Sequence, residues 1–256
     1  MINQKIVHLI LAIALLATPK LTLAADLEEI KSRGKLIVAV KDNLRPLGFA
    51  DPAGKLQGLE IDIARRLAEE ILGSADAVIL QPVTNEERLE IVMEGKVDLA
   101  IARVTLTASR NRLVDFSPYY YLDGTGLVTK SEQVKTLRDL ATKKIAVLNN
   151  SSTIAVVNHE LPNAQLIGVN SYQEALELLE AGKADGFAAD QSLLTGWVQE
   201  YPQYRLLPQR LSGEALGIVM PKGLQYLELR SKVNEAIARW QKSGWLRERA
   251  TYWGLP

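Results

Sequence analysis

The sequence predicts an α/β protein with two lobes. Apolar runs of strand length alternate with helical patterns throughout the chain, and such alternation is typical of parallel sheets joined by helical crossovers. The alternation occurs twice, around separate sets of strands, with a glycine-containing stretch at 119–128 between the two sets. We therefore expect two lobes, each built on a mainly parallel sheet with helices on both faces.

The first 24 residues indicate a secretory signal peptide rather than a part of the fold. Lys5 supplies a positive start, 7–17 is an apolar stretch, and small residues offer a cleavage site near Ala24. The apolar stretch is shorter than the roughly 20 residues that span a bilayer, although an uncleaved anchor remains an alternative. No cysteine lies near residue 24, which excludes a lipoprotein. We expect a periplasmic protein.

The composition excludes several kinds of partner and site. Without its first 24 residues the chain carries 28 basic and 30 acidic residues, which gives no electrostatic reason to expect a nucleic acid or an anionic membrane as a partner. The absence of cysteine excludes disulfides, zinc-thiolate sites and cysteine nucleophiles. We expect a monomer with no cofactor and no metal.

The elements can be read in order along the chain. In the helix predicted at 58–72, Ile63, Leu67 and Ile71 share one face and charged residues occupy the other. The rest of the first set comprises strands at 35–40, 78–83 and 99–104 and a helix at 86–93. The second set comprises strands at 144–148, 165–169 and 186–189 and helices at 153–160, 172–181 and 191–200.

Two segments are expected to connect the lobes, at 119–128 and 213–222. The second leads into an amphipathic helix at 225–241, which we expect to return to the first lobe. The expected bounds are therefore 25–121 with 222–256 for the first lobe and 122–221 for the second. Two connecting strands allow a cleft to close by a hinge motion, and ligand sites in such sheets lie at the carboxyl ends of strands.

The segment 97–119 carries a candidate anion site. Its strand runs into Thr105 and Thr107, and Arg110 follows on an expected short helical turn. Hydroxyls and backbone N–H groups beside one arginine form a small anion clamp, because a guanidinium binds a carboxylate through two parallel hydrogen bonds. The structural alternative is an exposed Arg110 that pairs with Asp115.

Several sequence blocks carry a resemblance to a known family. They are GKLIVAV at 34–40, GLEIDIARRLAEEI at 58–71, EGKVDLAIA at 94–102, DFSPYY at 115–120 and AGKADGFAAD at 181–190. In this order the chain resembles the periplasmic polar amino-acid binding proteins, solute-binding protein family 3. The resemblance covers essentially all of the chain after the signal segment. It implies a two-lobed type II periplasmic-binding-protein fold that delivers an amino acid to the membrane permease of an ABC importer.

The resemblance also implies roles for individual residues. The family's carboxylate-binding arginine corresponds to Arg110, its Ser/Thr partner to Thr105, and a neighbouring threonine to Thr107. Asp190 matches the acid that receives the ligand's ammonium group, although an aspartate there could equally cap the following helix. Clamp and acceptor would lie on opposite lobes, so binding of a zwitterion would require the lobes to close.

In the second lobe, the segment AVLNNSST at 146–153 corresponds to the family's strand, Gly-Thr-Thr-like turn and helix. Ser151 and Ser152 occupy the threonine positions, and Asn150 replaces the usual glycine. Serines there are also expected as helix caps. The two roles are compatible, because a helix start presents free N–H groups that favour an anion.

Side-chain specificity depends on positions where this chain departs from many relatives. Lys41, Leu44 and Asn85 stand where an acid or an aromatic residue is common, and Arg103 stands where glycine or serine is common. The run 83–92 resembles glutamate/aspartate binders, whose arginine at the Arg88 position meets the side-chain carboxylate.

We expect glutamate or aspartate as the ligand, because several buried cations without a partner would be costly. The alternative has Arg88 paired with a glutamate of its own helix and Lys41 directed into water. In that case a neutral polar ligand such as glutamine or asparagine fits better.

We expect no enzymatic activity. General acid–base chemistry needs a positioned proton carrier, and His159, the one histidine after the signal segment, is expected on a second-lobe helix away from the cleft. Some relatives of the fold resemble cyclohexadienyl dehydratases, and others serve as ligand-binding parts of receptors. A dehydratase-like enzyme and a ligand-binding sensor are therefore the alternative functions.

Overall fold

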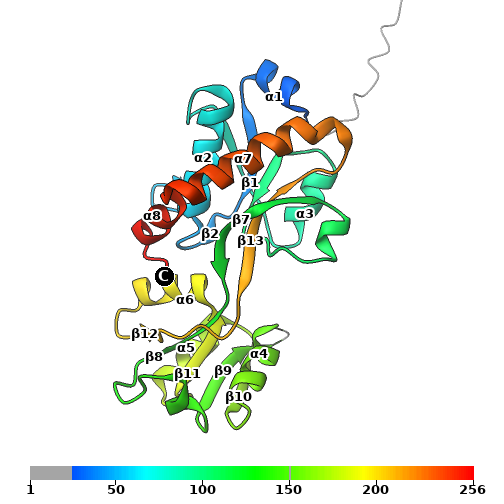
Figure 1. Cartoon of the computed structure of the whole chain (residues 1–256). Helices are drawn as coiled ribbons and strands as arrows, with labels where there is room; N and C mark the ends of the chain where they lie inside the picture. Colours follow the sequence, from blue (N-terminus) through cyan, green and yellow to red (C-terminus); the bar gives the residue numbers. More distant parts are fainter. Residues whose placement is uncertain (1–24, 150) are drawn as a thin grey trace, which may run out of the picture.

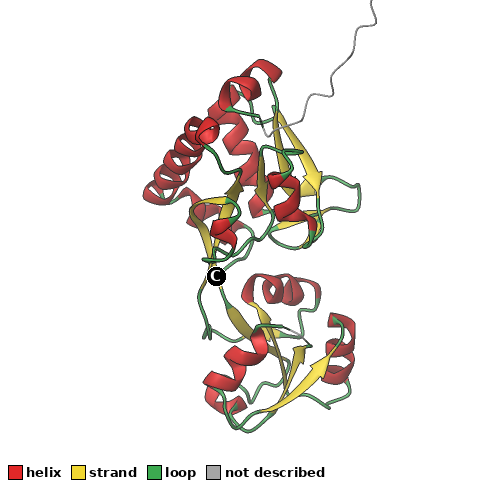
Figure 2. Cartoon of the chain, turned by 90° about the vertical axis from the view of Figure 1, so that its right-hand side faces the viewer, coloured by secondary structure: helices red, strands yellow, loops and turns green. Residues whose placement is uncertain are grey.

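The computed structural model describes residues 25–149 and 151–256, so the expected signal peptide and Asn150 lie outside the described residues. Figure 1 shows two lobes stacked end to end and joined by long strands that run between them. The view turned by 90° shows the same division into two lobes (Figure 2). The expected two-lobed α/β architecture is confirmed.

The first lobe is built on a five-stranded mixed sheet with the strand order β5-β1-β6-β13-β7. The strands β5 (Val78–Pro82), β1 (Leu36–Val40) and β6 (Leu99–Ile101) are parallel. The strand β13 (Glu214–Met220) is antiparallel to both β6 and β7 (Asp115–Asp123).

Helices cover both faces of this sheet and bury a separate apolar core on each. On one face lie α1 (Leu27–Arg33), α2 (Leu59–Leu72), α7 (Leu227–Ser243) and α8 (Trp245–Tyr252). The other face packs against α3 (Glu87–Met93). A small antiparallel sheet is formed by β2 (Asn43–Leu44), β3 (Gly48–Ala50) and β4 (Leu56–Gln57).

The second lobe repeats this plan with the strand order β10-β9-β11-β8-β12. Its parallel strands are β10 (Gln165–Val169), β9 (Lys144–Leu148) and β11 (Gly186–Asp190). The strands β8 (Thr125–Thr129) and β12 (Arg205–Leu206) complete the sheet in antiparallel pairings. One face packs against α5 (Tyr172–Glu180) and α6 (Gln191–Glu200), and the other against α4 (Thr153–Glu160).

Short 3-10 helices occupy Arg110–Arg112, Leu137–Leu140 and Leu224–Tyr226. The first of these confirms the expected helical turn at Arg110. None of the helices within 25–149 and 151–256 is both long and apolar enough to cross a membrane.

The two connections between the lobes touch each other. A Cβ atom on Gly124, between β7 and β8, would lie only 2.0 Å from the carbonyl oxygen of Ser212 in the other connection. The Thr125 N–H donates a hydrogen bond to Ser212 Oγ at 2.9 Å. By sheet membership the second connection lies before Glu214, because β13 pairs with β6 and β7 of the first lobe, whereas the expected boundary was at residue 221.

Candidate functional site

The loop after β6 is fixed at its backbone from two sides. Arg103 adopts a φ of 51°, a left-handed conformation in a residue with a Cβ atom. Its N–H donates to Glu60 Oε1 at 2.7 Å. Arg88 Nη1 donates to the carbonyl oxygens of Ala102 at 3.0 Å and of Arg103 at 2.5 Å. The strand predicted at 99–104 ends at Ile101. The hydrogen bonds from Arg88 and to Glu60 fix the backbone after it and thereby orient the Arg103 side chain.

Glu60, which receives this N–H, is fully buried and also accepts a hydrogen bond from the Tyr120 hydroxyl on β7. Burial raises the pKa of Glu60 to about 7, although the hydrogen bonds from Tyr120 and from the Arg103 backbone act in the opposite direction. Its other carboxylate oxygen has no hydrogen-bond partner. Glu60 therefore changes its protonation near neutral pH.

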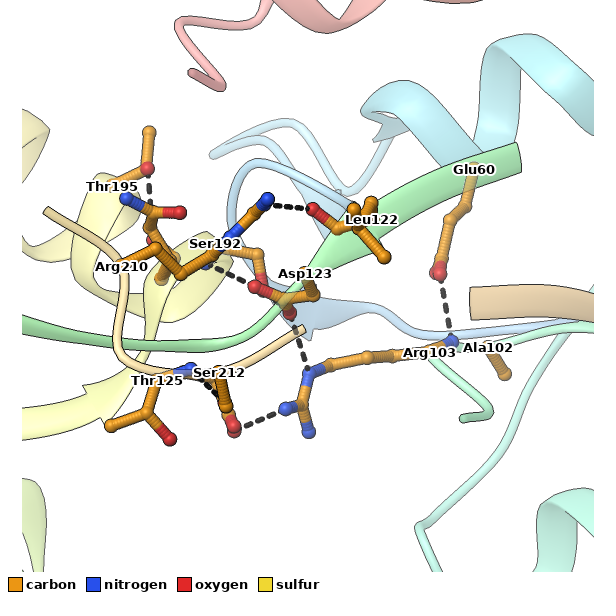
Figure 3. A network of polar contacts seen from close by, with 12 residues as sticks. Glu60, Ala102, Arg103, Leu122, Asp123, Thr125, Ser192, Thr195, Arg210 and Ser212 are labelled. Atoms are coloured by element: carbon orange, nitrogen blue, oxygen red, sulfur yellow. Dashed lines mark hydrogen bonds and ion pairs between the residues drawn. The ribbon is translucent and has the colours of Figure 1, made fainter. Parts of the chain in front are cut away.

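The Arg103 side chain extends from the first lobe to the hinge, formed by the two connections between the lobes, and to the second lobe. Figure 3 shows it extended from its backbone beside Ala102 toward Asp123, the last residue of β7. Arg103 Nε lies 3.6 Å from Asp123 Oδ2, and its guanidinium forms an ion pair with Asp190 at the end of β11. Asp123 also accepts hydrogen bonds from the N–H and hydroxyl of Ser192 at 3.0 and 2.6 Å.

Asp190 does not use its side chain to cap the helix that it precedes. It occupies the N-cap position of α6 but makes no capping hydrogen bond, so the capping alternative is not realised. Burial raises its pKa, while the positive charge of Arg103 lowers it. In this structure the expected ammonium acceptor is paired with a cation of the protein itself.

Arg110 is positioned by its own turn. Thr107 Oγ1 accepts a hydrogen bond from the Arg110 N–H at 3.3 Å, and Arg110 Nη1 donates to the Thr105 carbonyl oxygen at 3.0 Å. The alternative partner, Asp115, instead forms an ion pair with Arg230 on α7. Thr105 and Thr107 thus orient Arg110 and leave the rest of its guanidinium open.

Arg88 and Arg110 form a pair of like charges. The pKa of Arg88 is lowered, first by burial and then by the positive charges of Arg110 and Arg103. Within the described ranges, neither Arg88 nor Arg110 forms an ion pair, and Arg88 binds carbonyl oxygens rather than a glutamate of its own helix. A guanidinium group that is destabilised by a neighbouring cation favours the binding of an anion between the two.

A cavity of about 240 Å³ lies between the lobes. Leu44 and Arg45 line it from the first lobe, and Tyr172 and Trp197 line it from α5 and α6. Tyr172 also lies near the charged residues. Its pKa is raised first by burial and then by the negative charge of Asp190. The cavity and the charged residues therefore form adjacent parts of the surface between the lobes.

Lys41 and Asn85 lie at a different place, in a groove of the first lobe that Glu87 also lines. Lys41 is 5% exposed and donates from Nζ to the Val83 carbonyl oxygen at 2.7 Å. The alternative, in which Lys41 is directed into water, is therefore wrong. Its positive charge acts on Glu87, whose pKa is lowered mainly by hydrogen bonds from Thr84.

The two serines before α4 have local roles in the structure. Ser151 Oγ accepts a hydrogen bond from the Thr153 N–H at 3.2 Å, and Ser152 occupies the N-cap position without a capping hydrogen bond from its side chain. Their contact with a ligand stays a prediction. His159 lies exposed on α4 and is hydrogen-bonded to Glu160 at 2.9 Å.

The structure adds residues that the sequence reasoning did not single out: Glu60, Asp123, Tyr172 and Glu214. Glu214 lies opposite Asp123 in the sheet, and burial together with the negative charge of Asp190 raises its pKa. A sequence signal existed for Glu60, which is part of the block at 58–71. Across residues 25–149 and 151–256, no group of three or more histidine, aspartate or glutamate residues is arranged to hold a metal ion.

Comparisons with known proteins place this geometry in context. The model of the bacterial extracellular solute-binding proteins, family 3, matches residues 36–256. The glutamine-binding protein of Geobacillus stearothermophilus is 36% identical over 195 residues, which are 75% of this chain and 74% of that protein. The glutamine-binding protein of an ABC transporter of Bacillus subtilis is 29% identical and covers 87% of this chain, with 81% of its own length matched.

The solved structures agree with the fold. An ancestral cationic amino acid solute-binding protein superposes with a TM-score of 0.76 at 27% identity and covers 89% of this chain and 98% of its own. Both sequence relatives named above are described as glutamine-binding proteins.

Proposed function

The chain belongs to the bacterial extracellular solute-binding proteins of family 3, and we propose that it captures an α-amino acid between its lobes for the membrane permease of an ABC importer. The expected export, with cleavage near Ala24, would release it into the periplasm as a monomer. The relatives' names support an amino acid as the ligand and an ABC transporter as the system that is served.

The observation that carries this proposal is the pair formed by Arg88 and Arg110. The positive charge of Arg110 contributes to the lowered pKa of Arg88, and neither guanidinium group uses its donors for an ion pair within the described residues. A carboxylate bound to Arg110, within reach of the charge of Arg88, relieves the repulsion and gains charge-assisted hydrogen bonds. Arg110 is the seat of the ligand's α-carboxylate.

The other end of the zwitterion is recognised from the second lobe. Asp190 ends β11 on that lobe, and its carboxylate faces the positive charges of the first lobe. An α-ammonium group bound near Asp190 and an α-carboxylate bound to Arg110 need both lobes at once. Ligand capture is therefore coupled to lobe closure.

Glutamate and aspartate are the preferred side chains in this proposal. Arg88 supplies a second cation beside Arg110, and a second carboxylate complements it better than a neutral group does. The support from Lys41 is weaker than expected, because Lys41 binds the Val83 carbonyl in a separate groove. Glutamine is the second candidate, favoured by the two relatives that are named as glutamine-binding proteins.

A thermal-shift screen of the purified protein tests this proposal. The protein is first partly unfolded and dialysed to remove carried-over ligand, and is then heated with each of the twenty amino acids. A ligand at about 100 times its Kd stabilises the folded state by about 2.7 kcal/mol. We expect glutamate or aspartate to raise Tm most. An equal shift with glutamine would contradict the preference for acidic side chains, and no shift with any amino acid would contradict the proposed function.

A further inference from the structure

Arg103 occupies the position at which an amino acid's ammonium group would be received. Its guanidinium forms an ion pair with Asp190, and its Nε lies 3.6 Å from the buried Asp123. The three side chains are 18%, 22% and 1% exposed for Arg103, Asp190 and Asp123, respectively. A largely desolvated cation of the protein thus already meets the negative charge that is expected to attract the ligand.

This placement is built into the backbone. The left-handed conformation of Arg103 is held at its N–H by Glu60 and at its carbonyl oxygen by Arg88. A residue with a Cβ atom adopts this conformation only at an energetic cost, and these hydrogen bonds offset the cost. The loop is therefore fixed, and the side chain is directed at the hinge and the second lobe.

Charged groups from several elements surround Arg103. Asp123 ends β7, Asp190 ends β11 and Glu214 begins β13, and the negative charges of all three stabilise the guanidinium. On the positive side, the charges of Arg88 and Arg103 act on each other within the first lobe, and Arg110 acts on Glu214. A ligand's ammonium group would enter a site in which Arg103 already supplies one positive charge to Asp190.

We propose that Arg103 is a specificity-determining residue, which substitutes in part for the ligand's ammonium group at Asp190, so that the site also accepts carboxylates that lack an α-amino group. The inference rests on the proposed function, because it assumes that the ligand's carboxylate binds at Arg110. Without Arg103, a buried Asp190 would depend on the ligand for its positive charge. With Arg103, removal of the amino group leaves Asp190 paired.

The test compares each amino acid with the same molecule without its amino group. L-Glutamate is paired with glutarate, and L-glutamine with 4-carbamoylbutanoate. Calorimetric titration of the ligand-stripped protein gives the ratio of the two Kd values in each pair. A hydrogen bond to a charged group accounts for a factor of about ten to a hundred in Kd. Because Arg103 keeps Asp190 paired when the amino group is absent, we expect the analogue to bind the wild-type protein within about tenfold of the amino acid.

Three variants isolate the charge of Arg103. Arg103→Gly removes the side chain at a φ that glycine adopts without strain, and we expect it to raise the ratio at least about tenfold in favour of the amino acid. Arg103→Lys keeps the charge and should preserve most of the wild-type ratio. Arg112→Ala removes the same charge from an exposed position on the neighbouring 3-10 helix and should change nothing.

The outcomes separate this inference from the proposed function. An unchanged ratio in Arg103→Gly, with both amino acids still bound, overturns the role of Arg103 and leaves the proposed function intact. A wild-type protein that rejects both analogues by more than about a thousandfold overturns it as well. A wild-type protein that binds none of the four compounds contradicts the proposed choice of glutamate or glutamine as ligand, and the inference about Arg103 fails with it.

Discussion

Three arginines meet where β6 ends, and each has a different set of partners. Arg103 is neutralised by Asp190 and Asp123. Arg88 is used partly to hold backbone carbonyls, and Arg110 donates to the Thr105 carbonyl. A count of cations treats them as equivalent, whereas their partners show that Arg110, with Arg88 beside it, has the donors to bind an anion.

Glu60 gives a prediction at the scale of one residue. A carboxyl whose pKa rises from 4.5 to about 7 on folding binds its proton more tightly in the folded state. Stability is therefore lost as pH rises between about 4.5 and 7, by up to about 3 kcal/mol. The variant Glu60→Gln keeps an acceptor for Arg103 and Tyr120 but cannot ionise. We expect the wild-type protein to lose this stability relative to Glu60→Gln, measured by urea unfolding across that pH range.

Glu69→Gln is the matched control, because Glu69 is exposed on the same helix. We expect this variant to follow the wild-type pH profile. If the profiles of wild-type protein and Glu60→Gln are parallel across the pH range, Glu60 does not change its protonation there.

The sequence could predict the residues of the charged site better than their partners. Arg88, Arg103, Arg110 and Asp190 were all singled out. The charges of Arg110 and Arg103 act on Arg88, and those of Arg103 and Arg88 act on Asp190. The pairing of Arg103 with Asp190 could not be read from the chain, because it depends on a single left-handed residue that turns a side chain toward the other lobe. The burial of Lys41 against Val83 likewise depends on tertiary packing.

At the scale of elements, the hinge depends on the close approach of the two connections. We expect Gly124→Ala to destabilise the protein by about 1–3 kcal/mol, because the added Cβ would collide with the Ser212 carbonyl oxygen. Gly213→Ala is a matched control, since its Cβ would meet only Leu122, at 3.9 Å. Urea unfolding compares the two variants. Equal free energies of unfolding for the two variants would mean that the close contact between Gly124 and Ser212 does not contribute to stability.

Most elements of the two lobes could be predicted, because long periodic runs carry a strong signal. The helix expected at 58–72 is α2 (Leu59–Leu72), and the strand expected at 144–148 is β9 (Lys144–Leu148). The strands β2 (Asn43–Leu44) and β12 (Arg205–Leu206) have only two residues each, too few to show a period. The short helices α1 and α8 were also not predicted, and α8 is separated from α7 only by the left-handed Gly244.

At the scale of the whole molecule, the lobes touch outside the hinge. A Cβ on Gly196 of α6 would lie 2.4 Å from the Arg45 carbonyl oxygen of the first lobe. Gln199 of the same helix donates to the Trp253 carbonyl oxygen at 2.9 Å, close to the C-terminus that Figure 1 shows beside α6. The lobes are thus in contact at two places: along α6, and at the ion pair of Arg103 with Asp190. The charged residues lie where both lobes can reach one ligand.

The central claim is that Arg110 holds the carboxylate of an amino acid between the lobes. Its most direct test is calorimetric titration of ligand-stripped wild-type protein, Arg110→Ala and the exposed control Arg112→Ala with L-glutamate, L-aspartate and L-glutamine. We expect Arg110→Ala to bind every ligand of the wild-type protein at least about thirtyfold more weakly, and Arg112→Ala to match the wild type. Wild-type affinity in Arg110→Ala would contradict the claim.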